Sequence, residues 1–211
     1  PDWIDHNRDL ASKPGEATLK GNKRDLNPPG THWEYNDVRV NRLALALLRV
    51  FKRPLPAVLK ERIMDPIGAS DTWQWHGYEN SYVTINGQRM QSVSGGAHWG
   101  GGLWISTLDH ARVGLLMLNN GNWNGEQLIA RDWIEQSTTP CALNANYGLM
   151  WWLNAIGGQA PAAPRNNYFA KGVGANIIWV DPTHDMVCVV RWIDKEHFPA
   201  FAAKVLDAIK A

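Results

Sequence analysis

The chain has 211 residues, with 21 basic and 20 acidic side chains, so its formal net charge at pH 7 is +1. Charges of both signs are interspersed, which gives no electrostatic reason to expect nucleic acid or an anionic membrane as a partner. No apolar run is long enough to predict a transmembrane segment. The length suits one domain with a buried core, or one domain with a helical insertion.

Tryptophan and cysteine are the informative residue types. The chain contains 12 tryptophans. Large core anchors are the expected use for most of them, with an aromatic cleft as the alternative. Cys141 and Cys188 could form one disulfide, but two cysteines fix neither pairing nor compartment. The histidines show no metal-ligand spacing and no glycine pattern matches a nucleotide-binding loop, so we expect no metal and no cofactor.

The first 27 residues are polar and irregular, which predicts a loop with short helical turns. Trp3 is a candidate for substrate contact there, and a solvated connector is the alternative. The segment 28–31 then predicts a turn, because its prolines fix φ and its glycine relaxes it. This turn delivers Tyr35 to the start of a long helix.

The long helix is predicted to begin at Val38, with Asp37 as its N-cap, and to end before Pro54. Its buried side is predicted from helical spacing. That side comprises Leu43, Leu47, Val50 and Phe51. A second helix begins near Pro56 and ends at the turn 66–68, and its apolar side carries Val58, Leu59, Ile63 and Met64.

A β-hairpin is predicted next. The segment 82–85 alternates as a strand, Asn86-Gly87 is a strong signal for a tight turn, and 88–90 would return. The aromatic segment 72–78 before it is expected to line or cover the core. The glycine-rich segment 95–102 predicts a loop that allows close backbone approach.

The second half of the chain begins with a helix predicted over 107–118. Ser106 and Asp109 form its capping box, and Asn119-Asn120-Gly121 ends it. A further helix is expected at 130–137 and a buried strand at 147–153. Glycine, proline and alanine in 157–165 predict an irregular surface loop.

Two apolar segments near the end, 175–180 and 186–190, predict an antiparallel strand pair joined by 181–185. Their continuous apolar content indicates strands covered on both faces. The last helix is predicted to pack across them through an apolar stripe. That stripe comprises Phe201, Val205, Leu206 and Ile209.

Several short motifs occur in one order along the chain. They are Pro29-Gly30-Thr31, Trp33, Tyr35-Asn36-Asp37, Pro66-Ile67-Gly68-Ala69 with Thr72, Gly100-Gly101-Gly102-Leu103 with Ser106-Thr107-Leu108-Asp109, and Tyr147-Gly148. In this order the chain resembles the beta-lactamase-related serine hydrolases. These include class C beta-lactamases, penicillin-binding DD-peptidases, family VIII carboxylesterases and 6-aminohexanoate-oligomer hydrolases. The resemblance implies an α/β (α+β) fold of the beta-lactamase/transpeptidase type, with an antiparallel sheet flanked by helices and a helical region.

The resemblance also implies acyl transfer to a serine, followed by hydrolysis of an ester or amide. That nucleophile lies in Ser-x-x-Lys, where one helical turn brings the lysine amine beside the hydroxyl. None of the serines in this chain has lysine three residues later. We therefore expect the chain to be the C-terminal portion of one hydrolase domain, incomplete at its N-terminus and inactive alone.

Within that portion, residues 1–165 are expected to form the helical region and cleft loops, and 166–211 the strands and terminal helix. The expected partners are a small ester or amide substrate and the missing segment that carries Ser-x-x-Lys. The alternative is a non-catalytic binding module that has lost the nucleophile. The resemblance implies a periplasmic or secreted location, with the cytoplasm left open.

By resemblance, Tyr35 exchanges protons with the nucleophilic serine and the leaving group. A free tyrosine has a pKa near 10, so ionising it at pH 7 costs roughly 4 kcal/mol, which a nearby cation must offset. Asp37 stands where the family usually has asparagine. Since a carboxylate only accepts hydrogen bonds and repels anions, Asp37 favours neutral or amine-bearing substrates, with a simple helix cap as the alternative.

The third motif of the family, Lys-Thr-Gly or His-x-Gly on an edge strand, falls at Ala170-Lys171-Gly172. Lys171 is the substrate-binding candidate of this motif by resemblance, but it is displaced by one residue and would point to the other face of the strand. By resemblance, the Val173 N–H contributes to an oxyanion hole, and Gly172 lets the substrate lie close. A plain glycine at a strand end is the alternative for Gly172.

Overall fold

The computed structural model describes residues 27–28, 30–95 and 102–209. They form two compact units, which are described separately. The first contains the described residues up to Asp65 and 70–105, and the second contains 66–69 and the described residues from Ser106 onward. Trp3 and the glycines at 96, 100 and 101 lie outside the described residues. Within the described ranges, no helix is both long and apolar enough to cross a bilayer.

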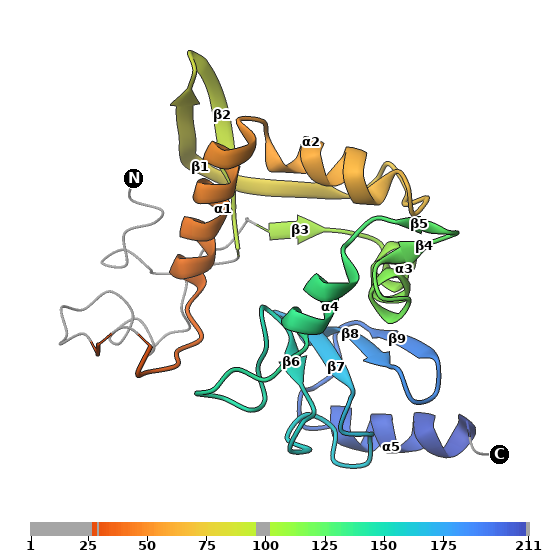
Figure 1. Cartoon of the computed structure of the whole chain (residues 1–211). Coiled ribbons are helices and arrows are strands. Elements are labelled where there is room, and N and C mark those ends of the chain that lie inside the picture. The colour runs from red at the N-terminus through yellow and green to blue at the C-terminus, as the bar shows by residue number, and fades with distance from the viewer. Residues whose placement is uncertain (1–26, 29, 96–101, 210–211) are drawn as a thin grey trace. The chain divides into compact units, whose positions relative to one another are not determined.

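The first unit joins helices to a three-stranded antiparallel sheet (Figure 1). In chain order its elements are α1 (Asp37–Phe51), α2 (Leu55–Leu59), a π-helical turn (Lys60–Met64), β1 (Gln74–Ile85), β2 (Gln88–Val93) and β3 (Gly102–Trp104). The sheet order is β2-β1-β3. The predicted hairpin is confirmed: Ile85 pairs with Gln88, and Asn86 and Gly87 both have positive φ, at 51° and 78°. Residues 74–78 of the aromatic segment form the first part of β1, and Trp73 before them is buried.

The predicted buried side of α1 is wrong, because Leu43, Leu47, Val50 and Phe51 are all exposed. The buried residues have the same helical spacing but lie on another side. They are Asn41, Ala44, Leu45 and Leu48. The apolar members pack with residues of β1 and β2 such as Tyr78 and Val93. Asn41 is buried because its Oδ1 accepts a hydrogen bond of 2.7 Å from the Gly95 N–H.

The predicted N-cap of α1 is also wrong by one residue. Asn36 has the extended backbone of a cap, and its Oδ1 accepts a hydrogen bond of 3.2 Å from the Arg39 N–H. Asp37 is therefore the first residue of the helix. Asparagine and aspartate cap about equally well, so adjacent candidates could not be separated by residue type. The second predicted helix is confirmed, with Val58 and Met64 buried.

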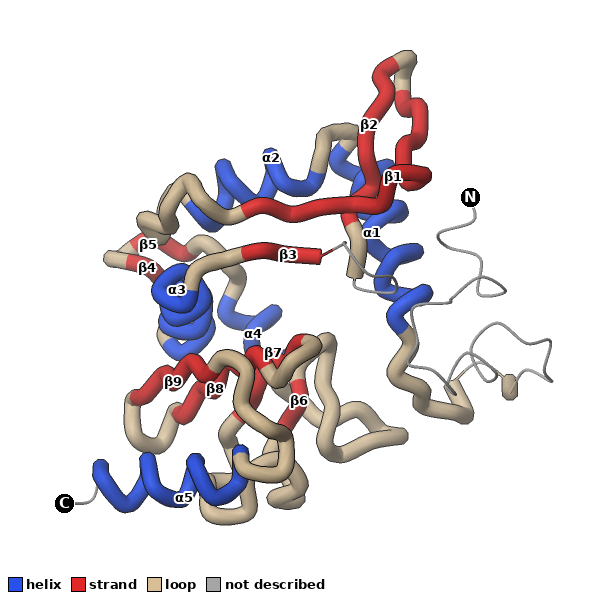
Figure 2. The backbone as a smooth tube through the Cα atoms, turned by 180° about the vertical axis from the view of Figure 1, so that it is seen from behind, coloured by secondary structure: helices blue, strands red, loops and turns tan. Residues whose placement is uncertain are grey.

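The second unit is built on a four-stranded antiparallel sheet of order β6-β7-β8-β9. Its elements are α3 (Thr107–Leu118), β4 (Asn122–Trp123), β5 (Glu126–Gln127), α4 (Arg131–Ser137), β6 (Trp152–Leu153), β7 (Tyr168–Gly172), β8 (Asn176–Asp181), β9 (Met186–Val190) and α5 (Phe198–Ile209). In Figures 1 and 2, α5 runs along one face of this sheet and α3 lies on the other. The expected fold class, helices flanking an antiparallel sheet, is confirmed.

Strand β8 is covered on both faces, as its apolar content predicts. Ile177 and Trp179 belong to the cluster that contains α5 residues such as Phe198. Ile178 and Val180 belong to a second cluster with Met117 of α3. The alternation follows from the period of two along a strand.

Helix α3 has the predicted bounds. The Ser106 hydroxyl accepts from the Asp109 N–H at 3.1 Å and donates to the Asp109 carboxylate at 2.8 Å. At the other end, the Gly121 N–H donates to the Leu116 carbonyl at 2.8 Å. Helix α4, with Ala130 as its N-cap residue, confirms the shorter helix predicted there.

The strand predicted over 147–153 is wrong. Only Trp152 and Leu153 are in a strand, and the chain turns between Tyr147 and Trp152, which bridge each other. Met150 has a φ of 68°, which a continuous strand cannot contain. Leu149 and Met150 are exposed at this turn.

Two expectations from composition also need correction. Among the tryptophans that the structure describes, Trp73 and Trp179 are buried, and three more pack half-buried against the core clusters, so the expectation that most are core anchors holds for about half of them. The three half-buried ones are Trp75, Trp151 and Trp152. Cys141 and Cys188 are both free thiols and form no disulfide. Burial raises the pKa of the Cys188 thiol.

Candidate functional site

Tyr35 lies in the first unit between a turn and a capped helix. The turn is closed by hydrogen bonds from the Thr31 N–H, at 3.2 Å, and the Thr31 hydroxyl, at 2.8 Å, to the Pro28 carbonyl. Asn36 then caps α1 and fixes the direction in which the chain enters the helix. Tyr35 is 43% exposed. Both neighbouring segments are held, and Tyr35 between them is partly exposed.

The N-terminus of α1 favours negative charge beside it, because its peptide dipoles leave partial positive charge there. This effect amounts to about 0.3–1 kcal/mol at an exposed position. Ionising an ordinary tyrosine at neutral pH costs roughly 4 kcal/mol. The helix therefore supplies only a minor part of that cost, and the requirement for a nearby cation stands.

Gly172 and Val173 lie in the second unit, where β7 turns into β8. Gly172 pairs with Asn176, which leaves the three residues 173–175 as the turn. Gly174 and Ala175 have positive φ, at 74° and 50°. Val173 is 73% exposed at the tip.

The resemblance implies an edge strand, whereas β7 lies between β6 and β8 and is open on one side only after Phe169. Strand β6 pairs only with Tyr168 and Phe169, so among the described residues nothing pairs with 170–172 on that side. A Cβ atom built at Gly172 would meet nothing nearer than the Asn176 carbonyl oxygen at 3.7 Å. The backbone of Gly172 is therefore open to close approach by another group.

The turn is fixed by the first residue of β8 and by two residues that follow β9. The Asn176 side chain donates to the Val173 carbonyl at 2.6 Å and accepts from Arg191 Nε at 2.7 Å. The Trp192 indole lies against Gly174, where a built Cβ atom would be 2.2 Å from Cζ3 of the ring. Sequence reasoning missed Asn176, Arg191 and Trp192, because no motif marks them and their contacts exist only once β7, β8 and β9 are paired.

Lys171 points into the protein on the side covered by α5. Its Nζ donates to Gln159 Oε1 at 2.5 Å and lies 5.1 Å and 5.3 Å from the ring centres of Phe169 and Phe198. Burial, together with the positive charge of Lys195, lowers the pKa of Lys171 to about 8. Its predicted role in substrate binding stays a prediction, and its ammonium is engaged by the protein's own groups.

The structure thus groups the predicted site residues in two places. Lys171, Gly172 and Val173 lie at one strand end of the second unit. Tyr35 and Asp37 lie at the start of α1 in the first unit, and the role of Asp37 toward substrate stays a prediction.

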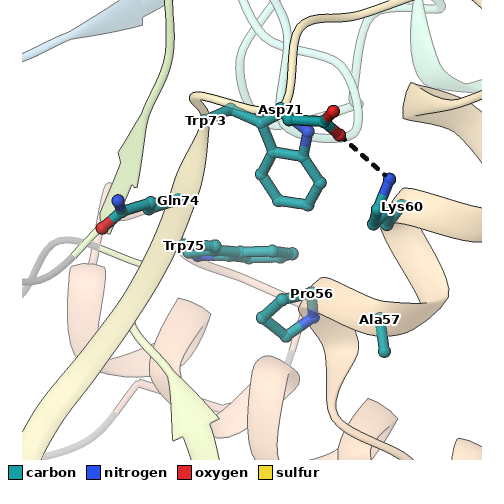
Figure 3. A pocket seen from close by; sticks show the side chains of 7 residues that line it. All are labelled: Pro56, Ala57, Lys60, Asp71, Trp73, Gln74 and Trp75. Atoms are coloured by element: carbon teal, nitrogen blue, oxygen red, sulfur yellow. Dashed lines mark hydrogen bonds and ion pairs between the residues drawn. The ribbon is translucent and has the colours of Figure 1, made fainter.

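The first unit also contains an open pocket of about 230 Å³. Figure 3 shows the rings of Trp73 and Trp75 opposite Pro56, with an ion pair of 3.4 Å between Lys60 and Asp71 at the side. This pocket follows the C-terminus of α1, whereas Tyr35 precedes its N-terminus. Helix α1, which lies between them in the chain, is about 22 Å long, and none of the residues that line the pocket belongs to the segment around Tyr35. The pocket is therefore not part of the tyrosine site.

Comparison with known proteins gives consistent matches. The family model described as "Beta-lactamase" matches residues 10–209. A protein of Escherichia coli O157:H7 named "Putative D-alanyl-D-alanine carboxypeptidase" is 24% identical over 204 residues, which cover 81% of this chain and 47% of that protein. The chain thus spans about half the length of the curated relatives it matches.

Solved structures agree on the fold. A beta-lactamase from Mycobacterium bovis superposes with a TM-score of 0.65 at 18% identity, over 100% of this chain and 74% of that one. A penicillin-binding protein homologue from Caulobacter crescentus superposes with a TM-score of 0.57 at 17% identity, over 90% of this chain and 64% of that one.

Proposed function

The chain belongs to the beta-lactamase family, and from this premise we propose that it supplies the tyrosine and part of the oxyanion hole of a serine hydrolase. The reaction is transfer of an acyl group from an ester or amide to a serine, followed by hydrolysis of the acyl-enzyme. The observation that carries the proposal is the position of Tyr35, accessible between a closed turn and a capped helix, within the family match.

In the first step, the Tyr35 phenolate takes the proton from the serine hydroxyl while the serine oxygen bonds to the substrate carbonyl carbon. The bond to the leaving group then breaks, and the leaving group takes that proton from Tyr35. Water attacks the acyl-enzyme by the same route, which releases the acid and regenerates the serine. Proton transfer of this kind contributes about 10²–10⁴-fold to rate.

The nucleophile and the cation that keeps Tyr35 ionised come from a Ser-x-x-Lys segment outside these 211 residues. None of the serines present has lysine at the third following position, and the match covers 47% of the E. coli relative. The chain by itself is therefore inactive in this proposal. Its partner in the reaction is that segment.

The oxyanion hole uses the N–H of Val173 with the N–H of the missing serine. Two well-placed donors stabilise the negative charge that develops on the carbonyl oxygen, and loss of one such donor costs about 10²–10³-fold in rate. The support here is local: Val173 is exposed at the turn, and Gly172 offers open backbone beside it.

The substrate is a small neutral or amine-bearing ester or amide. Asp37 motivates this choice, because a carboxylate at that position disfavours the anionic groups of penicillins and D-Ala termini. A non-catalytic binding protein is the second candidate, favoured by the absence of Ser-x-x-Lys from the sequence.

The proposal is tested in the protein encoded by the complete reading frame. A fluorophosphonate probe should label one serine, and mass spectrometry should place that serine in a Ser-x-x-Lys segment before Pro1. Tyr35→Phe should lower kcat/KM for a p-nitrophenyl ester by two or more orders of magnitude, with the fold verified by circular dichroism. Equal turnover in the variant would remove Tyr35 from the mechanism. If no serine is labelled and no ester is turned over, the non-catalytic binding protein is the remaining candidate.

A further inference from the structure

Trp192 combines two properties that a structural residue rarely has. It is 73% exposed, although an indole is the largest apolar side chain. Its φ is 59°, a left-handed conformation that is a genuine outlier for a bulky residue. Strained backbone of this kind persists only where the surroundings impose it, and it concentrates at functional sites.

Residues before and after Trp192 impose this left-handed backbone conformation. Val190 is fixed in β9 by pairing with Ile177, and Ile193 packs against the cluster formed with α5. Arg191 is held by its hydrogen bond to Asn176. With its neighbours anchored, the chain turns sharply at position 192 and places the indole on the surface instead of in the core.

The exposed indole lies on the turn that carries the proposed oxyanion donor. It contacts Gly174, one residue from Val173, and the side chain of Val173 is itself 73% exposed. Gly174 has no Cβ, which makes room for the ring to lie directly on the turn. The two exposed apolar side chains thus flank Gly174 at the open end of β7.

We propose that Trp192 contacts substrate and sets specificity, by forming an apolar wall for the hydrophobic group next to the scissile carbonyl. This inference rests on the proposed hydrolase function and narrows its substrate class to neutral esters or amides with an extended alkyl or aryl group. A small acyl group such as acetyl would not reach the wall. A group several methylenes long would cover the indole and be selected for it.

The test compares ester series in the protein encoded by the complete reading frame. Trp192→Ala should lower kcat/KM for p-nitrophenyl hexanoate about tenfold relative to p-nitrophenyl acetate, a change on the scale expected when contacts of one or two methylenes are lost. Trp192→Phe should keep most of the preference. The ratio of kcat/KM for phenyl acetate to that for ethyl acetate tests in the same way whether Trp192 contacts the leaving group.

Two controls separate the indole from the backbone. Trp192→Gly accepts the positive φ and Trp192→Ala does not, yet both should lose the same preference because both lack the ring. Trp133→Ala removes another exposed tryptophan of the same unit, on α4, and should leave the hexanoate-to-acetate ratio unchanged. If the ratio falls in Trp133→Ala as well, or differs strongly between the Gly and Ala variants, the wall at Trp192 is wrong.

The outcomes also distinguish a failure of this inference from a failure of the proposed hydrolase function on which it rests. An active Trp192→Ala variant with wild-type preference in both ester series overturns the role of Trp192 and leaves the hydrolase intact. If the wild-type protein hydrolyses no ester, the hydrolase proposal fails, and calorimetric binding of the neutral amide hexananilide decides about Trp192. Binding about tenfold weaker in Trp192→Ala supports the contact, and equal binding overturns it.

Discussion

Two glycines of the β7–β8 turn should respond in opposite ways to the same substitution. Gly174 has a φ of 74°, and a Cβ atom there would lie 2.2 Å from Cζ3 of Trp192. Gly172 is outside the left-handed region, and its Cβ atom would meet only Asn176 atoms at 3.7 and 3.8 Å. Gly174→Ala should therefore affect the fold, whereas Gly172→Ala should affect only what binds to the turn.

The magnitudes follow from these contacts. An alanine in the left-handed region costs about 1–2 kcal/mol, and the exposed indole can swing aside to relieve the clash. For a chain of this length, that cost lowers Tm by about 2–8 °C. Gly172→Ala makes only ordinary van der Waals contacts, so its stability should stay within about 0.5 kcal/mol of wild type.

Activity should show the reverse order. If substrate lies against the backbone at Gly172, a methyl group there displaces the carbonyl from Val173, and a shift of about 1 Å can cost on the order of 100-fold in rate. Gly172→Ala should thus lose at least tenfold in kcat/KM for a p-nitrophenyl ester at unchanged Tm. Thermal unfolding and initial rates in the complete protein measure both. Full activity in Gly172→Ala would refute close approach at this residue, and an unchanged Tm in Gly174→Ala would refute the cost of a left-handed alanine at position 174.

Three further predictions concern other residues. The Asn154 side chain makes five hydrogen bonds to the backbone of a buried loop, so Asn154→Ala should lower the free energy of unfolding by about 3 kcal/mol or more. The control Asn122→Ala, in an exposed turn, should lower it by less than about 1 kcal/mol, and thermal unfolding measures both. Burial, and then the charge of Arg191, lower the pKa of His110 to about 4, although the charge of Asp109 acts in the opposite direction. As the pH falls below about 6.5, His110 is therefore protonated in the unfolded chain but still neutral in the folded protein. Stability should therefore fall between pH 6.5 and 4, by about 1–2 kcal/mol once solvent screening is allowed for, and a His110→Gln variant that shows the same fall would assign it to other groups. Asp37→Asn should raise kcat/KM for a carboxylate-bearing beta-lactam relative to a neutral ester, and a flat or falling ratio would show that the charge at 37 does not select substrate.

Elements with strong local signals could be predicted from the sequence with nearly correct bounds. The Ser106 cap and the Asn119-Asn120-Gly121 stop define α3 through hydrogen bonds within a few residues. Asn86-Gly87 defines the hairpin in the same way, since both residues adopt the positive φ that the turn requires. In these cases the backbone conformation depends on neighbours in sequence.

The buried side of α1 could not be predicted, because the helix is apolar on two sides. Leu43 and Leu47 are larger than Ala44, so hydrophobicity favours the wrong side. Ala44 is buried because it packs in the cluster with β1 and β2, and Asn41 is buried because it meets the Gly95 N–H. Both contacts depend on segments about 50 residues away, which no periodicity encodes.

The loop 157–165 shows how a single polar residue can override composition. Its glycine, proline and alanine content predicts an irregular surface loop, yet Ala160 and Ala163 are buried. The fully buried Asn154 donates to the carbonyls of Ala160, Ala163 and Pro164 and accepts from two backbone N–H groups. Asparagine is common in exposed turns as well, so the residue type alone could not predict that Asn154 holds this loop from a buried position.

The same turn of the second unit bears on the choice between enzyme and binding protein. A protein that only binds needs an apolar surface, which Trp192 and Val173 provide at any orientation of the backbone beneath them. An oxyanion hole needs the Val173 N–H in one fixed direction, since hydrogen bonds weaken steeply with angle. The Asn176 side chain bonds the Val173 carbonyl, and Arg191 bonds Asn176, which fixes the peptide group between Val173 and Gly174. The Val173 N–H belongs to the preceding peptide group, which starts at Gly172, the residue paired with Asn176 at the end of the β7–β8 ladder. Fixing a peptide plane at an exposed tip adds little to the area available for binding, but it is what preorganised stabilisation of a developing charge requires. The contacts on both sides of Val173 therefore support the proposed hydrolase over the binding protein.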